Sequence, residues 1–154
     1  MKYKIIFFDF LGVFIQPRSA AMLFRNSMLD GFILEMKSCI EAIGGAYTLC
    51  IISSSSVSDI SKVLDAHDIT SSFSDIICST HKGTDISLLL KEFGLSASEA
   101  LFVTDTCGDL RSVRQVEGLN TAAVCWGIGR EDDLSICEPT FLIKKVSELQ
   151  SLLS

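Results

Sequence analysis

The sequence predicts an α/β fold, with a doubly wound, mainly parallel sheet and helices on both faces, in a single domain over residues 1–154. Short apolar runs alternate with segments whose apolar residues recur every three or four positions, which is the order expected of βαβ units. The first stretch, residues 3–13, is a short apolar run bounded by a glycine, as in a strand buried on both faces. The length of 154 residues suits one compact domain.

The first strand ends at Asp9, where the apolar residues stop and a tight turn begins. Ligands of open α/β sheets bind beyond the carboxyl ends of the strands, so chemistry is expected at Asp9. Asp is also a common cap of turns and helices, and this alternative stays open for Asp9 taken alone. Residues 14–26 show no clear period, and Pro17 with the small residues at 19–21 predicts a loop and a short helical turn.

The next part of the chain predicts a helix, a strand and a second helix. Apolar residues at three- and four-residue intervals indicate a helix over 30–43, with Asp30 as its N-cap and Gly44 as its end. A buried strand over 47–52 runs into four consecutive serines, and an amphipathic helix over 57–67 follows them.

Two further strand–helix units are expected after residue 70. A short strand over 73–78 precedes a helix that Asp85 caps and that continues to residue 93. The fourth strand, 100–103, runs into an Asp-rich turn. The apolar spacing of Leu110, Val113 and Val116 predicts a helix after that turn, ending at Gly118.

The C-terminal part predicts two strands and one helix. A strand over 121–126 is followed by a charged loop over 127–137. A short strand over 141–143 and a helix over 146–153 close the predicted fold.

Composition narrows the classes of partner. The formal net charge is −6, and no cluster of Lys and Arg offers to neutralise phosphates, so nucleic acid is not expected as a partner. No apolar run reaches the roughly 18 residues of a membrane span. The N-terminal stretch lacks a signal-peptide pattern, because a carboxylate interrupts it. We therefore expect a cytoplasmic protein with no membrane partner.

The six cysteines show no metal-ligand spacing, which favours a reduced, cytosolic chain. Cys50, Cys78 and Cys125 lie inside apolar runs, where cysteine behaves as a small hydrophobic residue. Cys107 differs because its neighbours are polar and rich in Asp. A catalytic thiol at Cys107 is a minor alternative, since no His lies near it in the sequence.

Polar side chains follow four of the predicted strands, and the carboxyl ends of parallel strands meet at one edge of a sheet. They are Asp9, Ser53, Lys82, Asp105 and Asp109. A carboxylate nucleophile, a hydroxyl with loop N–H groups and a cation together form a site for a phosphoryl group. Asp9 with Asp105 or Asp109 offers the hard oxygen ligands that Mg²⁺ prefers. Taken singly, Lys82 also fits a solvated loop charge, and Asp109 a helix cap.

These stretches resemble the four motifs of the haloacid dehalogenase-like (HAD) hydrolases, in the same order. The family's D-x-D-G-[T/V] turn reads DFLGV at residues 9–13, and its apolar strand ending in Ser or Thr reads IISS at 51–54. Its third-motif lysine, usually followed by Pro, is Lys82, followed here by Gly83. Its G-D-[S/T]-x-x-D motif reads TDTCGD at 104–109. The resemblance covers nearly the whole chain and implies a Rossmannoid, HAD-like fold.

The resemblance also implies roles in phosphoryl transfer. Asp9 would attack phosphorus and form an aspartyl-phosphate. Ser53, Ser54 and nearby backbone N–H groups would bind the phosphoryl oxygens together with Lys82.

A magnesium site is implied at the same edge of the sheet. Asp105 would hold Mg²⁺ together with Asp9 and the backbone carbonyl of Leu11. Asp109 would assist, either as a ligand or by contacts to the ligands.

Leu11 departs from the family pattern, because phosphatases of the family carry there a second Asp that protonates the leaving group and activates water. A positioned acid or base is worth roughly 10²–10⁴-fold in rate, and Leu supplies neither function. Three readings remain: a slow Mg²⁺-dependent phosphohydrolase, a catalytically degenerate module that binds a phosphorylated ligand or a protein, and a dehalogenase-like hydrolase. The third ranks lowest, since dehalogenases need no metal and the Asp pair resembles a retained metal site.

No separate cap domain is expected. The chain between residues 9 and 53, and between 82 and 105, is taken up mostly by one predicted helix each. Many family members enclose small substrates under a cap, so a capless member predicts an open site. Such a site suits a phosphorylated substrate that is macromolecular or extended, or it is covered by a second subunit in a homo-oligomer.

Overall fold

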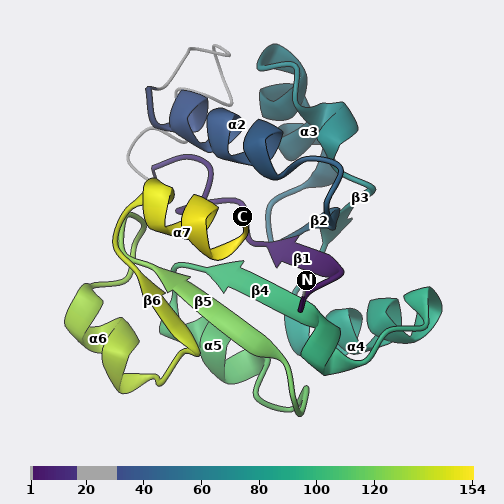
Figure 1. The fold of residues 1–154 in the computed structure, drawn as a ribbon, viewed down its shortest axis with the longest axis vertical. Coiled ribbons are helices and arrows are strands. Elements are labelled where there is room, and N and C mark those ends of the chain that lie inside the picture. The colour runs from purple at the N-terminus through teal and green to yellow at the C-terminus, as the bar shows by residue number, and fades with distance from the viewer. Residues whose placement is uncertain (1, 17–30) are drawn as a thin grey trace.

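A parallel sheet organises the computed structural model, which describes residues 2–16 and 31–154 (Figure 1). The described residues form six strands in the spatial order β3-β2-β1-β4-β5-β6, and every neighbouring pair is parallel. The strands are β1 (Ile5–Phe8), β2 (Thr48–Ser53), β3 (Asp75–Cys78), β4 (Ala100–Thr104), β5 (Asn120–Val124) and β6 (Phe141–Ile143). This confirms the predicted fold class, with strand ends shifted by at most two residues.

The strand order reverses at β1. From β1 the chain first builds outward through β2 to β3, and it then returns to the other side of β1 and continues through β4 to β6. Phe8, the last residue of β1, pairs with Ile51 on one side and with Val103 on the other. A crevice outside the carboxyl ends of the strands at such a reversal is where open α/β sheets bind ligands. Asp9 follows immediately after this point.

Helices cover both faces of the sheet. They are α2 (Gly31–Ile43), α3 (Val57–Ala66), α4 (Lys82–Phe93), α5 (Cys107–Ser112), α6 (Glu131–Ile136) and α7 (Val146–Leu152), with 3₁₀ turns η2 (Thr70–Ser72) and η3 (Ala97–Glu99). Figure 1 shows α2 and α7 side by side over one face, whereas α4 and α5 lie on the opposite face.

The alternation of side chains along β1 produces two separate hydrophobic cores. Ile6 and Phe8 pack with residues of α2, α3 and α7. Ile5 and Phe7 pack with residues of α4 and with the segment after α5. All four side chains are fully buried, as expected for the central strand of a sheet covered on both faces.

The start of α4 corrects the prediction that Asp85 caps this helix. The helix begins at Lys82, and the backbone N–H of Asp85 donates to the carbonyl of His81, which places Asp85 in the first turn. The glycine after Lys82 suggested a loop, but Gly is tolerated in a helix at a cost of about 1 kcal/mol. Lys82 is therefore fixed at a helix start and is not a solvated loop charge.

The helix after the Asp-rich turn is shorter than predicted. Only Cys107–Ser112 is helical, and tighter turns with bonds from Val116 to Val113 and from Leu119 to Val116 carry the chain onward. Val113 and Val116 are nevertheless buried. The apolar spacing correctly predicted which side chains are buried, but it does not distinguish an α-helix from consecutive turns of a similar period.

The loop predicted over 127–137 instead contains the short helix α6. Its first turn carries the three acidic residues at 131–133, which interact favourably with the positive end of the helix dipole. Leu134 is fully buried and fixes the helix against the sheet. Charge density alone indicated a loop here, although acidic residues are also typical of a helix start.

Cys107 and Cys137 form a disulfide, with 5.8 Å between their Cα atoms. This corrects the expectation of a fully reduced chain, and Cys107 is not a free thiol in this structure. The other four cysteines are free. The two bonded residues are far apart in sequence and meet only because α5 and α6 pack together, so spacing alone did not indicate the pair.

Some predictions fall outside the described residues. The loop predicted over 14–26 is described only as far as Gln16, and Asp30 with its capping role lies outside. No helix among the described residues is long and apolar enough to cross a membrane. The single-domain organisation over 1–154 stays a prediction.

An aromatic cluster holds the loop after β1. Phe10 and Phe14 are fully buried, and their rings stack with centroids 5.6 Å apart. Phe14 also meets Phe8 edge-on at 5.4 Å and Phe73 at 5.7 Å. Pairs of this geometry stabilise beyond the area they bury. Asp9 thus lies between two phenylalanines, Phe8 and Phe10, that are both packed in the core.

We expect Phe14→Ala to reduce the free energy of unfolding by about 3–5 kcal/mol, because it leaves a cavity inside this aromatic cluster. Urea unfolding measures the loss. Leu88→Ala is the matched control, since Leu88 is 60% exposed and its removal should change stability by no more than about 0.5 kcal/mol. A loss below about 1 kcal/mol for Phe14→Ala would show that the cluster does not hold the loop.

Candidate active site

Asp9 occupies the first position beyond β1. Its backbone N–H donates to the carbonyl of Val103 at 2.9 Å, which extends the pairing with β4 by one bond. The N–H of Phe10 donates to Asp9 Oδ1 at 2.8 Å and fixes the orientation of the carboxylate. The side chain is only slightly exposed, so its charge is removed from water and depends on its neighbours.

A glycine turns the chain back over a second carboxylate. Gly12 has a φ of +83°, a backbone conformation that is unfavourable for residues with a Cβ. Its N–H donates to the carbonyl of Ile15 at 2.8 Å. A Cβ on Gly12 would lie 1.9 Å from Asp105 Oδ2, so no other residue fits there without displacing that carboxylate. This turn brings the first and fourth motifs into contact.

Leu11 lies between Asp9 and this glycine, at the position where a second Asp was expected. Its side chain is half-buried and packs against the larger hydrophobic core. An apolar residue is therefore compatible with the fold of the turn. A leucine side chain, however, has no group that could donate or accept a proton.

Lys82 joins two of the predicted acidic residues. Its Nζ lies 3.1 Å from Asp9 Oδ1 and 2.7 Å from Asp109 Oδ2. Gly83 allows this arrangement, because a Cβ there would come within 2.3 Å of the carbonyl oxygen of Ser112. The glycine that replaces the family's usual proline therefore lets α4 approach the end of α5 closely.

Asp109 is held on two sides in the first turn of α5. Besides Lys82, the hydroxyl of Thr104 donates to Asp109 Oδ2 at 2.7 Å. The backbone N–H of Asp109 donates to the hydroxyl of Thr106, the N-cap of the helix, at 3.3 Å. One oxygen of Asp109 is thus committed to the lysine and the threonine, which favours a supporting role over direct metal ligation.

Asp105 is fully buried at the end of β4. The backbone N–H of Ile128 donates to its Oδ2 at 2.8 Å, and the N–H of Gly129 donates to its carbonyl at 3.0 Å. A Cβ on Gly127 would approach Oδ2 to 2.3 Å, so the carboxylate is enclosed by two glycine turns. Among the residues that the structure describes, Asp105 Oδ1 is buried and has no hydrogen-bond partner, an arrangement that costs free energy unless something else contacts it.

Burial and neighbouring charges shift the ionisation of this cluster. Burial raises the pKa of Asp9 from 3.8 to about 7, although the Lys82 ammonium opposes the shift. Burial also raises the pKa of Asp105, against the hydrogen bond from Ile128. For Lys82 burial lowers the pKa, but Asp9 and Asp109 outweigh it and the net shift is upward. Three carboxyl groups share one ammonium, so the site favours an additional cation or a proton.

The donor set fits Mg²⁺. Asp9 and Asp105 offer hard carboxylate oxygens, and the unpartnered Oδ1 of Asp105 would gain a ligand. Over residues 2–16 and 31–154, no group of three or more His, Cys, Asp or Glu is arranged to hold a metal ion. A site built from two carboxylates, a backbone carbonyl and water is consistent with this, because Mg²⁺ usually keeps several waters.

The two predicted serines lie at the end of β2, one strand away from Asp9. Ser53 is buried, and its hydroxyl accepts from the N–H of Ser55 at 3.2 Å. Ser54 is exposed. The structure brings Asp9, Lys82 and Asp109 into direct contact. Both serines lie at the same edge of the sheet, where the hydroxyl of Ser53 bonds to its near neighbour Ser55.

Three supporting contacts were not predicted from the sequence. They are the Thr104 hydroxyl on Asp109, the backbone N–H of Ile128 on Asp105, and the indole N–H of Trp126, which donates to the carbonyl of Val13 at 3.0 Å. A signal was present in the glycines at 127 and 129, which follow a strand at the same edge as the predicted site. Close approach of backbone to a carboxylate is a common reason for such glycines.

Comparison with known proteins identifies similar sequences. Residues 26–124 match the family model described as haloacid dehalogenase-like hydrolase. A stretch of 67 residues is 36% identical to pyrophosphatase PpaX of Bacillus pumilus. That match covers 44% of this chain and 31% of the relative, so the chain spans about a third of the relative's length.

Solved structures of similar fold cover nearly the whole chain. A hydrolase of the haloacid dehalogenase-like family from Streptococcus pneumoniae superposes with a TM-score of 0.79 at 17% identity, over 99% of both chains. The 3-deoxy-D-manno-octulosonate 8-phosphate phosphatase of Moraxella catarrhalis, in complex with magnesium, phosphate and its sugar, superposes with a TM-score of 0.68 at 18% identity. It covers 98% of this chain and 85% of that one. At these identities the likeness concerns the fold alone.

The raised pKa of Asp9 predicts how stability depends on pH. Between pH 3.8 and about 7 the folded protein binds more protons than the unfolded chain, so this contribution to stability is lost as pH rises toward and through 7. Without metal, the melting temperature should fall from pH 5 to pH 8, and Asp9→Asn should reduce that slope. Asp132→Asn, at an exposed acid of α6, should leave the slope unchanged. An equal slope in Asp9→Asn and the wild type would contradict the assignment.

Proposed function

Since the chain belongs to the haloacid dehalogenase-like hydrolases, we propose that it is a Mg²⁺-dependent phosphohydrolase in which Asp9 is the nucleophile. The observation that carries this proposal is the contact of one buried ammonium, Lys82, with both Asp9 and Asp109 at the carboxyl edge of the sheet. A buried nucleophile beside a fixed cation suits attack on an anionic centre such as phosphorus.

The proposed reaction has two steps. A carboxylate oxygen of Asp9 attacks phosphorus, the bond to the leaving oxygen breaks, and an aspartyl-phosphate forms. Lys82 neutralises phosphoryl oxygens, and the Ser53–Ser54 segment would add a hydroxyl and backbone N–H groups. Water then hydrolyses the aspartyl-phosphate and releases phosphate. Magnesium bound by Asp9, Asp105 and the Leu11 carbonyl would supply charge neutralisation at the phosphoryl oxygens.

The substrate class follows from the relatives and from the site. The names of the relatives, a pyrophosphatase and a phosphatase, support a phosphorylated substrate. An open site without a cap domain stays a prediction. We therefore keep the proposal that the substrate is macromolecular or extended, or that a second subunit covers the site. Asp9 is 6% and Lys82 7% exposed, so both side chains present little surface to solvent in the described structure.

The proposal includes a cytoplasmic location without nucleic-acid or membrane partners. The net charge of −6 supports the first exclusion. The cytoplasm is a reducing compartment, where disulfides are usually transient and redox-responsive. In a cytoplasmic protein we therefore expect the Cys107–Cys137 bond to form and break reversibly.

Leu11 favours a second candidate function, binding of a phosphorylated ligand or a protein without turnover. The half-buried leucine provides no acid for the leaving group and no base for water. The dehalogenase-like reading is weaker, because the buried Asp105 oxygen without a partner fits a metal and the resemblance implies that dehalogenases need none.

The first test concerns the metal. Mg²⁺ should raise the melting temperature by mass action, because only the folded chain brings Asp9 and Asp105 together. The shift should vanish in Asp105→Asn and persist in the control Asp132→Asn. A scanning fluorimetry series over Mg²⁺ concentration measures it. If Asp105→Asn keeps the full shift, Asp105 is not a ligand.

The second test concerns turnover. With an activated aryl phosphate, which needs little protonation, the wild type should give a burst and accumulate phosphorylated Asp9, since hydrolysis lacks a base. Leu11→Asp should restore steady turnover by roughly 10²-fold or more. Intact-protein mass and steady-state kinetics report both effects.

Leu11→Asn is the matched control for this test, because it adds polarity but no proton-transfer group, and it should not restore turnover. Asp9→Asn should abolish the burst. The binding-module reading predicts neither burst nor rescue. A Leu11→Asp variant that folds, binds Mg²⁺ and does not turn over would refute the phosphohydrolase.

A further inference from the structure

We propose that the Cys107–Cys137 pair is a reversible redox site, and that its reduction loosens the first turn of α5 and weakens Mg²⁺ binding at the adjacent carboxylates. The redox site stands on the disulfide and its surroundings. Its coupling to magnesium rests on the proposed metal site.

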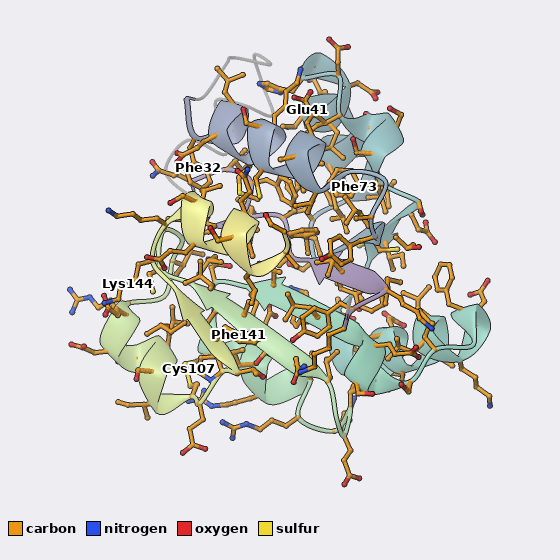
Figure 2. The ribbon with its side chains drawn as sticks, in the orientation of Figure 1. Phe32, Glu41, Phe73, Cys107, Phe141 and Lys144 are labelled. Carbon is orange, nitrogen blue, oxygen red and sulfur yellow. A yellow bond between two sulfur atoms is a disulfide. The ribbon has the colours of Figure 1, made fainter. Side chains whose placement is uncertain are left out.

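The bond joins two elements that frame the metal-binding edge. Cys107 is the first residue of α5 and lies midway between Asp105 and Asp109. Cys137 is the C-cap of α6 and is almost completely buried. Figure 2 labels Cys107 on the side of the sheet where α6 packs. The disulfide therefore fixes the stretch that carries both acidic residues of the fourth motif.

Besides the disulfide, a small number of non-covalent contacts hold α5 in place. The helix has only six residues, a length at which helical propensity alone does not sustain a helix. Leu110 is its buried side chain, and it packs in a small cluster with Leu134 and Cys137. The disulfide is the covalent part of that cluster. Without it the short helix would be held by that apolar cluster, by its Thr106 cap and by the lysine and threonine contacts of Asp109. Just beyond the helix, the hydrogen bond from Arg114 to the carbonyl of Cys137 would be the remaining polar link to the end of α6.

The other side of the metal-binding edge is connected to the same cluster. Leu134 of α6 packs close to Gly129, at about 2.9 Å from where a Cβ on that glycine would lie. Gly129 and its neighbour Ile128 are the residues whose N–H groups bind Asp105. Fixing α6 against α5 therefore stabilises both contacts that hold Asp105, one to its carboxylate and one to its backbone carbonyl.

The bond can be reached by a reductant. Cys107 is half-buried, and its partner Cys137 lines a cavity of about 290 Å³ together with Leu110 and other residues. A small dithiol is the reductant in the proposed step. Its thiolate attacks the disulfide and forms a mixed disulfide, and one protein sulfur leaves as a thiolate. The second thiol of the reductant then releases the other cysteine, so two electrons pass to the protein and the dithiol becomes a cyclic disulfide.

Two of the free cysteines are poorly suited to this exchange. Cys39 and Cys50 are buried, and burial raises the pKa of each thiol to about 11, which suppresses the reactive thiolate. Cys78 is exposed and lies at the end of β3, the edge strand opposite β6. It serves as the internal control.

The experiment compares the full chain after oxidation and after reduction with a dithiol. Thiol alkylation followed by mass measurement should count two fewer thiols in the oxidised protein and recover them on reduction, through repeated cycles. Reduction should lower the melting temperature by roughly 5–15 °C, because it releases a loop of 30 residues in the unfolded chain. Amide hydrogen exchange at residues 105–112 should accelerate, and the apparent Kd for Mg²⁺ should rise by about tenfold.

Variants separate the explanations. Cys137→Ser, distant in sequence from the metal-binding residues, should behave as the reduced protein under both conditions. Cys78→Ser should cycle as the wild type does. An oxidised protein that retains all six thiols would overturn the redox site. Equal Mg²⁺ affinity and equal exchange in both states would overturn the coupling. If neither state binds Mg²⁺, the proposed metal site fails together with the coupling, while the thiol count still decides the redox site.

Discussion

A single buried ammonium holds together the acidic side chains at the carboxyl edge of the sheet. Lys82 contacts Asp9 and Asp109, which belong to segments far apart in sequence, and all three side chains have little access to water. Removing one partner of such a cluster leaves an uncompensated buried charge, which is strongly destabilising. The arrangement requires β1 to lie between β2 and β4, with α4 starting directly at the lysine. Since Asp105 adds a third carboxyl group, the cluster is electrostatically complete only with a further positive charge.

Much of the fold follows from patterns that a sequence displays directly. Apolar runs such as Ile5–Phe8 are strands because no polar residue interrupts them, and helices alternate with them. Parallel strands have one carboxyl edge, so the polar residues that end them, including Asp9 and Lys82, could be placed together in advance. The spacing of Val113 and Val116 correctly predicted burial, although these residues lie in turns beyond the end of α5.

The remaining features depend on the backbone and on distant packing. Asp105 is bound by the backbone N–H of Ile128. Every residue type except proline has such an N–H, so the residue type at this position does not indicate the contact. The disulfide requires α5 and α6 to meet, which is a tertiary event. Gly83 stands where the family usually has proline, and only the structure shows that it lets the carbonyl of Ser112 come close. In each case the local pattern is compatible with several structures, and packing selects one.

The hydrogen bond from Trp126 to Val13 gives the protein a built-in optical probe. Trp126 is the only tryptophan in the sequence, and its indole N–H is tied to the carbonyl of the turn that carries Leu11 and Gly12. The ring also lies 5.8 Å from that of Phe32, at the start of α2. Because indole emission is sensitive to polarity and to hydrogen bonding at the ring nitrogen, the intrinsic fluorescence of the unlabelled protein reports on the position of this turn. Movements of the loop beside Asp9 can thus be followed in real time, from a single tryptophan and without any engineered label.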